Sequence, residues 1–278
     1  MKDVSVRELK NTATRMRMKV VDMVYKAQSG HPGGSLSAAD FVTACYFKYM
    51  NIDPANPKWE NRDRMVLSKG HVCPIQYACL ATAGYFPEDV LDTLRKEGSM
   101  LQGHPSMTKC PGIDISTGSL GQGLACAVGM AMAGKIDKKD YKVFCIMGDG
   151  ECQEGEIWEA ANTANKYQLD NLIAFVDFNN LQIDGTCDQV MPNGNLGKKF
   201  EAFGWEIIEI DGHNMEEICA TLDKCYASKN GKPKCIYAHT IKGKGVSYME
   251  NSCSWHGTAP NKAERDQAIA ELTAQLIQ

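Results

Sequence analysis

The sequence lacks the features of secreted, membrane-spanning and nucleic-acid-binding proteins. Its first residues read MKDVSVRELKNTATRMRMKVV, and charges run through them, unlike a signal peptide. The longest apolar stretch, LACAVGMAMA, is too short to span a bilayer. A net charge of −4 gives no bulk attraction to nucleic acid or anionic lipid. We therefore expect a soluble, cytoplasmic protein that binds neither membranes nor nucleic acid.

The chain also lacks a disulfide or zinc pattern, although it contains 12 cysteines. No two of them stand at C-x-x-C spacing, and several, among them Cys126 and Cys145, lie within apolar runs. In a chain of this length with 14 methionines and no secretory signal, we expect buried free thiols in a reducing compartment.

The composition is that of a globular protein, with 44% hydrophobic and 23% charged residues among 278. An amphipathic helix is predicted over residues 6–28, ended by Gly30 and Pro32, and a second over 37–50. Apolar runs predict strands at 64–68, 142–147, 171–177 and 234–240, with 205–210 as a fifth. Further helices are predicted over 72–83, 88–97, 121–134, 155–167, 195–203, 214–228 and 262–278.

This order of elements predicts the fold class. The strands are continuously apolar, as in a parallel sheet that is covered on both faces. Alternation with helices indicates one doubly wound α/β domain over residues 1–278, with helices on both faces of a mainly parallel sheet. Ligands bind such sheets beyond the carboxyl ends of the strands. The segments SKGH, GDG, FNN and TIKGKG, which follow four predicted strands, are therefore the candidate site.

A carboxylate and a carboxamide follow two consecutive predicted strands. Asp149 stands in GDG, and Asn179 begins the NN pair thirty residues later. Both are hard oxygen ligands of the kind that Mg²⁺ takes together with phosphate oxygens. Gly148 and Gly150 leave room for a diphosphate to approach the backbone, and a helix starting near Glu154 adds a favourable dipole. A lone GDG is also a common turn, so the pairing with NN carries the interpretation.

These residues resemble the GDG…NN motif of thiamine-diphosphate enzymes. The rest of the chain resembles the N-terminal, diphosphate-binding domain of transketolase. The matching stretches are SGHPGG (29–34), LSKGHVCPIQYACL (67–80), QGHPS (102–106), STGSLGQGL (116–124), GDGECQEG (148–155), DFNNLQIDG (177–185) and TIKGKGVSYMENSCSWHG (240–257). The resemblance covers about residues 25–260. It implies the thiamine-diphosphate-binding fold, with thiamine diphosphate and Mg²⁺ (or Ca²⁺) as cofactors.

The resemblance also implies roles for individual residues. The metal ligands would be Asp149, Asn179 and the backbone carbonyl of Leu181. The cofactor contacts would be His71, Gly118, Leu120, Asp149, Gly150, Asn179, Lys242 and His256, joined by Glu154 at a subunit interface. The substrate channel would hold His31, His104 and His256 as catalytic residues. The KGKG segment around Lys242 is equally typical of a solvated loop.

The histidine pattern supports this interpretation. Only six histidines occur, and four of them lie beside glycine within the matching stretches: His31, His71, His104 and His256. Histidines in such loops suit a reaction that moves protons between sugar hydroxyls near neutral pH. The remaining two, His213 and His239, are predicted to be structural.

The resemblance ends before the pyrimidine-binding and C-terminal domains of the family. In transketolases the glutamate that activates the cofactor lies in the pyrimidine-binding domain, with arginines that hold the sugar phosphate. We therefore expect the N-terminal subunit of a split transketolase, acting with a C-terminal subunit in an α₂β₂ heterotetramer. The implied reaction, a step of the pentose phosphate pathway, transfers a two-carbon ketol unit from a ketose phosphate to an aldose phosphate.

Three alternatives stay open. A deoxyxylulose-phosphate synthase shares GDG…NN and two of the histidines, but His104 in QGHPS and the SWHG segment favour transketolase. Another ketol-transfer enzyme could use an unusual sugar or formaldehyde as acceptor. A non-catalytic interaction subunit is the third, and the intact metal and histidine positions argue against it.

Overall fold

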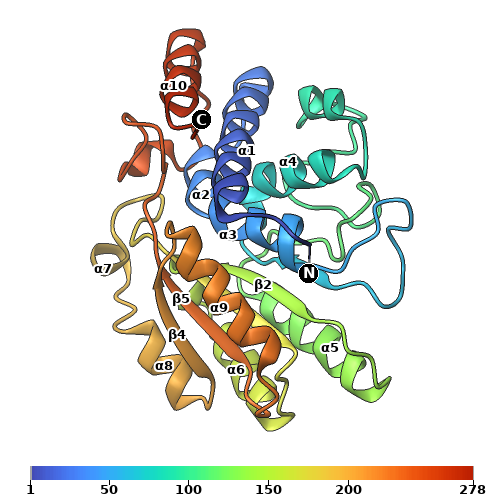
Figure 1. Ribbon diagram of the computed structural model, residues 1–278. Helices are drawn as coiled ribbons and strands as arrows, with labels where there is room; N and C mark the ends of the chain where they lie inside the picture. The colour runs from blue at the N-terminus through green and yellow to red at the C-terminus, as the bar shows by residue number, and fades with distance from the viewer. Residues whose placement is uncertain (1, 278) are drawn as a thin grey trace.

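The computed structural model, which describes residues 2–277, is built on a five-stranded parallel sheet (Figure 1). The strands lie in the order β1-β2-β3-β5-β4, and every neighbouring pair is parallel. Their bounds are β1 (Arg64–Leu67), β2 (Val143–Gly148), β3 (Leu172–Phe178), β4 (Glu206–Asp211) and β5 (Lys234–His239). All five predicted strands are therefore present, and the fifth, β4, lies at the edge.

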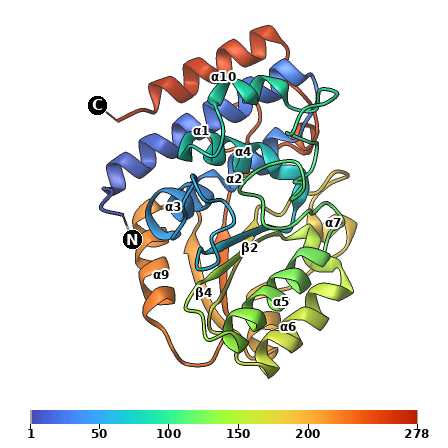
Figure 2. The ribbon, with the colours of Figure 1, turned by 90° about the vertical axis from the view of Figure 1, so that its right-hand side faces the viewer.

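Helices cover both faces of this sheet. Figure 2 shows α1 and α10 above one side, with α5 and α6 on the other. The helices are α1 (Val6–Ala27), α2 (Pro32–Ser37), α3 (Ala39–Ala44), α4 (Cys73–Ala83), α5 (Gln122–Ile136), α6 (Gly155–Lys166), α7 (Cys187–Val190), α8 (Leu196–Ala202), α9 (Met215–Ala227) and α10 (Lys262–Ala274). The predicted doubly wound α/β class is confirmed.

Alternate residues of the strands enter two separate cores, because successive side chains of a strand point to opposite faces. In β2, Phe144 and Ile146 pack with α1, α3, α4 and α9. Their neighbours Cys145 and Met147 pack with α5, α6 and α8. On the first face the Phe41 ring stacks on the Phe175 ring at a centroid distance of 4.0 Å. Both faces of the central strands are buried, which explains their continuously apolar sequences.

Three predicted helices differ from the structure. The helix expected over 37–50 begins at Pro32 and runs as α2, α3 and a π-helical turn (Cys45–Tyr49). Proline is favoured at the first helical position, because its missing N–H has no partner there in any case. The first helix ends earlier, at Ala27, where Gln28 takes a left-handed conformation. The helix expected over 88–97 is only a 3₁₀ segment, Glu88–Thr93.

The cysteines are free thiols, as expected, and most of them are buried. Ten of the 12 cysteines are buried and all are free, but Cys126 is exposed because it lies on the outer face of α5. None of the helices within residues 2–277 is both long and apolar enough to cross a membrane.

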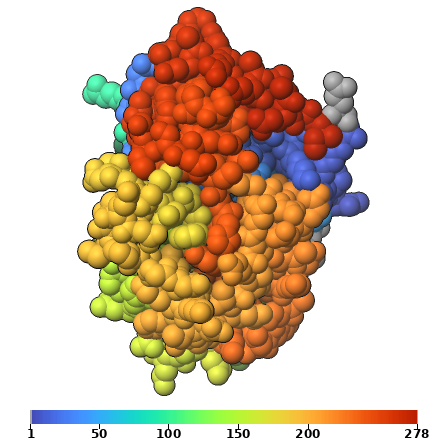
Figure 3. All heavy atoms as spheres, turned by 90° about the vertical axis from the view of Figure 1, so that its left-hand side faces the viewer, coloured from blue at the N-terminus to red at the C-terminus, as the bar shows by residue number. Residues whose placement is uncertain are grey.

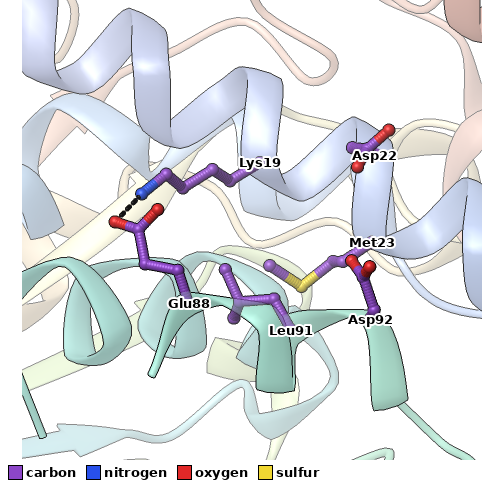
Figure 4. A pocket seen from close by; sticks show the side chains of 6 residues that line it. All are labelled: Lys19, Asp22, Met23, Glu88, Leu91 and Asp92. Carbon is purple, nitrogen blue, oxygen red and sulfur yellow. Dashed lines mark hydrogen bonds and ion pairs between the residues drawn. The ribbon is translucent and has the colours of Figure 1, made fainter. Parts of the chain in front are cut away.

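A small hollow lies between α1 and the 3₁₀ segment (Figure 4). Its charged side chains are paired: Lys19 binds Glu88, and Lys26 from the hollow's edge binds Asp22 and Asp92 at 2.8 and 2.7 Å. These ion pairs hold the segment against α1. None of the residues predicted to bind a ligand lies there.

The Phe41–Phe175 stack predicts a stability effect. Phe175→Ala should lower the free energy of unfolding by about 3–5 kcal/mol, because it leaves a cavity between α3 and the sheet. Tyr167→Ala, at a residue 53% exposed, should change it by less than about 0.5 kcal/mol. Urea unfolding followed by circular dichroism measures both. Equal effects would contradict the packing described.

Candidate cofactor-binding site

A pocket of about 380 Å³ lies beyond the carboxyl ends of β1, β2, β3 and β5. The four segments singled out in the sequence reach it, since Lys69, Asp149, Asn179 and Lys242 all line it. Figure 3 shows this side of the molecule, with the segment around α7 (yellow) below the segment that follows β5 (red-orange) in the view. The pocket therefore occupies the place where a doubly wound sheet binds ligands.

All but one of the residues predicted for the site line this pocket. They are His31, His71, Gly118, Leu120, Asp149, Gly150, Glu154, Asn179, Leu181, Lys242 and His256. The exception is His104, an exposed residue whose ring centroid lies 6.5 Å from that of His31. It packs against Gly118, where a Cβ would come within 3.0 Å of its ring. His104 thus stands at the rim rather than in the wall.

Asp149 is a buried carboxylate at the end of β2, with a side chain that faces two backbone N–H groups. Its Oδ1 accepts a hydrogen bond from Gly150 N at 2.7 Å, and its Oδ2 accepts one from Asn180 N at 2.5 Å. Asn180 adopts a left-handed conformation with φ of 58°, which turns its N–H toward the carboxylate. Burial and the nearby Asp177 carboxylate raise the pKa of Asp149 to about 6. A cation beside Asp149 would favour its ionised form.

Two further oxygens complete a set of hard donors. The Asn179 Oδ1 accepts from Leu181 N at 3.1 Å, and the Leu181 carbonyl accepts from Lys242 Nζ at 3.1 Å. Each oxygen has a second lone pair for a cation. Within residues 2–277 no three His, Cys, Asp or Glu side chains are grouped to hold a metal. A metal here would therefore use one carboxylate, one carboxamide and one carbonyl, which suits Mg²⁺ or Ca²⁺.

Three histidine rings line one side of the pocket. The ring centroids of His31, His71 and His256 lie 5.0–5.5 Å from one another. Burial and the Arg95 guanidinium lower the pKa of His31 to about 4, and burial and the Lys242 ammonium lower the pKa of His256 to about 3. Burial and Lys69 hold the pKa of His71 well below its usual value. All three rings are therefore neutral near pH 7.

A buried lysine fixes the tautomer of one ring. The Lys242 Nζ lies 2.7 Å from His256 Nδ1. An ammonium group can only donate, so His256 Nδ1 accepts and the ring proton resides on Nε2. Lys242 is 2% exposed, so the interpretation of its segment as a solvated loop is wrong. Burial and Lys69 lower the pKa of Lys242 to about 8.

An ion pair that the sequence motifs did not reveal supports these groups. Lys69 Nζ contacts Asp177 Oδ2, and both side chains are buried. Burial would raise the pKa of Asp177, but Lys69 and the hydroxyls of Ser37 and Thr240 lower it overall. Asp177 also accepts a hydrogen bond from Asn179 Nδ2 at 3.4 Å. The sequence held a signal for Asp177, because this charged residue ends the otherwise apolar run at 171–177.

Glu151 is a second buried carboxylate that the sequence did not single out. Its Oε1 accepts from Ser68 Oγ at 2.5 Å and from Gly121 N at 3.0 Å, while its Oε2 accepts from Gly148 N at 3.0 Å. The side chain thereby joins the loops that follow β1 and β2 to the start of α5. Both Glu151 and Glu154 follow GDG, and the sequence alone does not show that Glu151 is buried while Glu154 is exposed.

Comparison with known proteins agrees with this geometry. Residues 9–275 match the family described as "Transketolase, thiamine diphosphate binding domain". The chain is 44% identical over 273 residues to one subunit of the apulose-4-phosphate transketolase of Phocaeicola vulgatus, covering 98% of this chain and 96% of that one. It is 46% identical over 265 residues to the 6-deoxy-6-sulfo-D-fructose transketolase subunit SqwG of Clostridium sp., covering 95% and 96%.

Longer relatives match over part of their length. Human transketolase is 43% identical over 272 residues, which cover 96% of this chain and 42% of that protein. The crystal structure of transketolase from Campylobacter jejuni has a TM-score of 0.91 and 36% identity, covering 98% of this chain and 43% of that one. The chain thus spans less than half of these full-length proteins.

The depressed histidine pKa values predict a pH effect on stability. A histidine in the unfolded chain has a pKa of about 6.5. In the folded chain the pKa of His31 is about 4 and that of His256 is about 3. The unfolded state therefore takes up more protons as the pH falls, and these residues lower the unfolding free energy between about pH 7 and 4. Urea unfolding at pH 7 and 5 measures the change.

The matched variant is His31→Asn combined with His256→Asn, because asparagine does not titrate. The loss of stability from pH 7 to 5 should be smaller in this variant than in the wild-type chain. An unchanged loss would mean that the two rings titrate normally in the folded protein.

Proposed function

The chain belongs to the transketolase family, and from this premise we propose that it is the N-terminal, diphosphate-binding subunit of a split transketolase. The observation that carries the proposal is one pocket with the oxygen donors Asp149, Asn179 and Leu181, two buried lysines and three neutral histidines. The proposed reaction transfers a two-carbon ketol unit from a ketose phosphate to an aldose phosphate. The proposed cofactors are thiamine diphosphate and Mg²⁺.

The residues present fit the proposed cofactors. Asp149, Asn179 and the Leu181 carbonyl would hold the metal, and Gly150 and Lys242 would contact the diphosphate. Gly148 and Gly150 carry no side chain where the diphosphate would approach. Thiamine diphosphate, when bound, supplies the carbon nucleophile that adds to the ketose carbonyl. The chain's own contribution is to bind, orient and exchange protons.

The histidines are proposed to act on the substrate oxygens. His256 carries its ring proton on Nε2, so it can donate a hydrogen bond to an oxygen that gains negative charge. His31 and His71 remain neutral at pH 7 and can therefore accept as well as donate. His104, at the rim, is proposed to contact the sugar after it enters. Leu120 and Gly118 are proposed to lie beside the cofactor rings.

A partner chain is proposed to complete the site. In full-length relatives this chain corresponds to less than half of the protein, whereas the two subunit relatives have its length. We propose that a C-terminal subunit supplies the pyrimidine-binding domain and that the assembly is an α₂β₂ heterotetramer in the cytoplasm. Glu154, exposed at the mouth of the pocket, is proposed to contact that partner.

The sugar is the least defined part of the proposal. The names of two similar subunits mention apulose-4-phosphate and 6-deoxy-6-sulfo-D-fructose. Both names describe sugars that end in an anionic group. We therefore propose a ketose with a phosphate or sulfonate as donor, and the ordinary ketose phosphates of the pentose phosphate pathway are the first to test.

The first test mixes this chain with its proposed partner subunit. Ketol transfer should require both chains, and Asp149→Ala should lower kcat at least a hundredfold by removing the metal carboxylate. Asp140→Ala is the matched control, because Asp140 is an exposed carboxylate near the opposite end of β2. A coupled assay of aldose release measures the rate. Full activity of this chain alone, or of the Asp149 variant, would overturn the proposal.

The second test separates ketol transfer from the synthase alternative. The mixed subunits should release no carbon dioxide from pyruvate in the presence of an aldose phosphate, while a ketose phosphate donor supports transfer. Labelled pyruvate measures this directly. Carbon dioxide release at a rate comparable to ketol transfer would favour a deoxyxylulose-phosphate synthase instead.

A further inference from the structure

We propose that the side-chain amide of Gln182 is a further binding group for the cofactor diphosphate. The proposal rests on the proposed function, because it takes thiamine diphosphate as the ligand of the pocket. Gln182 directly follows the Leu181 carbonyl and lines the same pocket. It was not among the residues predicted from the sequence.

The backbone around Gln182 is held in one place by local hydrogen bonds. Leu181 and Thr186 form an isolated antiparallel bridge, and Gln182 N donates to Gly185 O at 2.8 Å. Asn180, on the preceding side, donates its N–H to Asp149. The loop is thereby tied both to itself and to the end of β2. The direction of the Gln182 side chain is set by this framework.

The side chain lies over the glycine expected to approach the diphosphate. A Cβ on Gly150 would stand 3.1 Å from Cγ and Cδ of Gln182 and 3.3 Å from its Nε2. The Gln182 amide and the Gly150 backbone therefore lie next to each other in the lining of the pocket. A phosphate oxygen that accepts from the Gly150 N–H would lie within reach of a neighbouring amide donor.

The Gln182 amide nitrogen is a buried donor that lacks a strong acceptor within residues 2–277. Its Nε2 is buried and has no hydrogen-bond partner among the described residues. Buried donors are nearly always paired, because losing water without gaining a partner is unfavourable. The nearby Cys187 thiol interacts with Gln182, but a thiol is a weak acceptor, and burial and Asp149 raise its pKa to about 12, which keeps it neutral. An acceptor supplied by a ligand would satisfy the amide.

The Lys242 ammonium favours an anionic oxygen as that acceptor. Lys242 and Lys69 are buried cations in the same pocket, and the Lys242 ammonium lies 3.1 Å from the Leu181 carbonyl next to Gln182. A carboxamide donor adds hydrogen bonding without adding another charge. Gln182 would thus supply a directed N–H to a diphosphate oxygen, with Lys242 supplying the counter-charge.

The chain offers a matched control in Gln153. This glutamine lines the same pocket, but its Nε2 already donates to the Met191 carbonyl at 2.7 Å. Gln182→Met keeps the length of the side chain and removes the donor. Gln182→Glu keeps its shape and replaces the donor by an acceptor that repels phosphate. Thermal unfolding of each variant verifies that the fold is retained.

The test is calorimetric titration of the chain with Mg²⁺ and either thiamine diphosphate or inorganic diphosphate. Gln182→Met should weaken both ligands by about tenfold, and Gln182→Glu by more, because a hydrogen bond to a charged group is lost. Gln153→Met should change either Kd by less than about twofold.

Each other outcome has a defined meaning. Unchanged binding by both Gln182 variants would overturn the role of Gln182 and leave the proposed function intact. Weaker binding of thiamine diphosphate alone would place the contact away from the diphosphate and would also overturn it. If the wild-type chain bound neither ligand, both the role of Gln182 and the proposed cofactor site would fall.

Discussion

The buried ion pair between Lys69 and Asp177 is the interaction on which the site depends. It joins the loop after β1 to the end of β3, across the intervening strand β2. Ser37 from α2 and Thr240 after β5 also donate to Asp177, at 2.5 Å in the case of Ser37. One carboxylate therefore ties together four segments that are distant in the sequence. Removing either member of such a pair leaves an uncompensated buried charge, which destabilises a fold by about 3–5 kcal/mol.

The same burial governs the chemistry of the pocket. Asp149, Glu151 and Asp177 are three buried carboxylates, and Lys69 and Lys242 are two buried ammonium groups. The carboxylates exceed the cations by one, and burial raises the pKa of both Asp149 and Glu151. A divalent cation beside Asp149 would offset this excess, while Lys242 would face an anionic ligand. The nearby histidines stay neutral for the same reason, because a buried pocket with two ammonium groups disfavours a further positive charge.

The architecture could be predicted from the sequence because it depends on local patterns. Continuous apolar runs marked the strands, and the polar segments after them marked the pocket. The boundaries were harder: Pro32 suggested the end of a helix, but it stands at the first position of α2. The spacing of GDG and NN pointed to Asp149 and Asn179. Lys69 and Gln182 could not be identified in this way, because their importance lies in burial and in contacts with residues far away along the chain. Asp177 was marked as a charge at the end of an apolar run, but its partners were not.

We propose that this chain holds the metal and the diphosphate with its own residues. The most direct measurement is a crystal structure of the chain with thiamine diphosphate and Mn²⁺ in place of Mg²⁺, with anomalous scattering recorded for manganese. We expect one anomalous peak in coordination contact with Asp149, Asn179 and the Leu181 carbonyl, and a diphosphate beside Gly150. A metal peak elsewhere, or a diphosphate bound away from these residues, would contradict the claim.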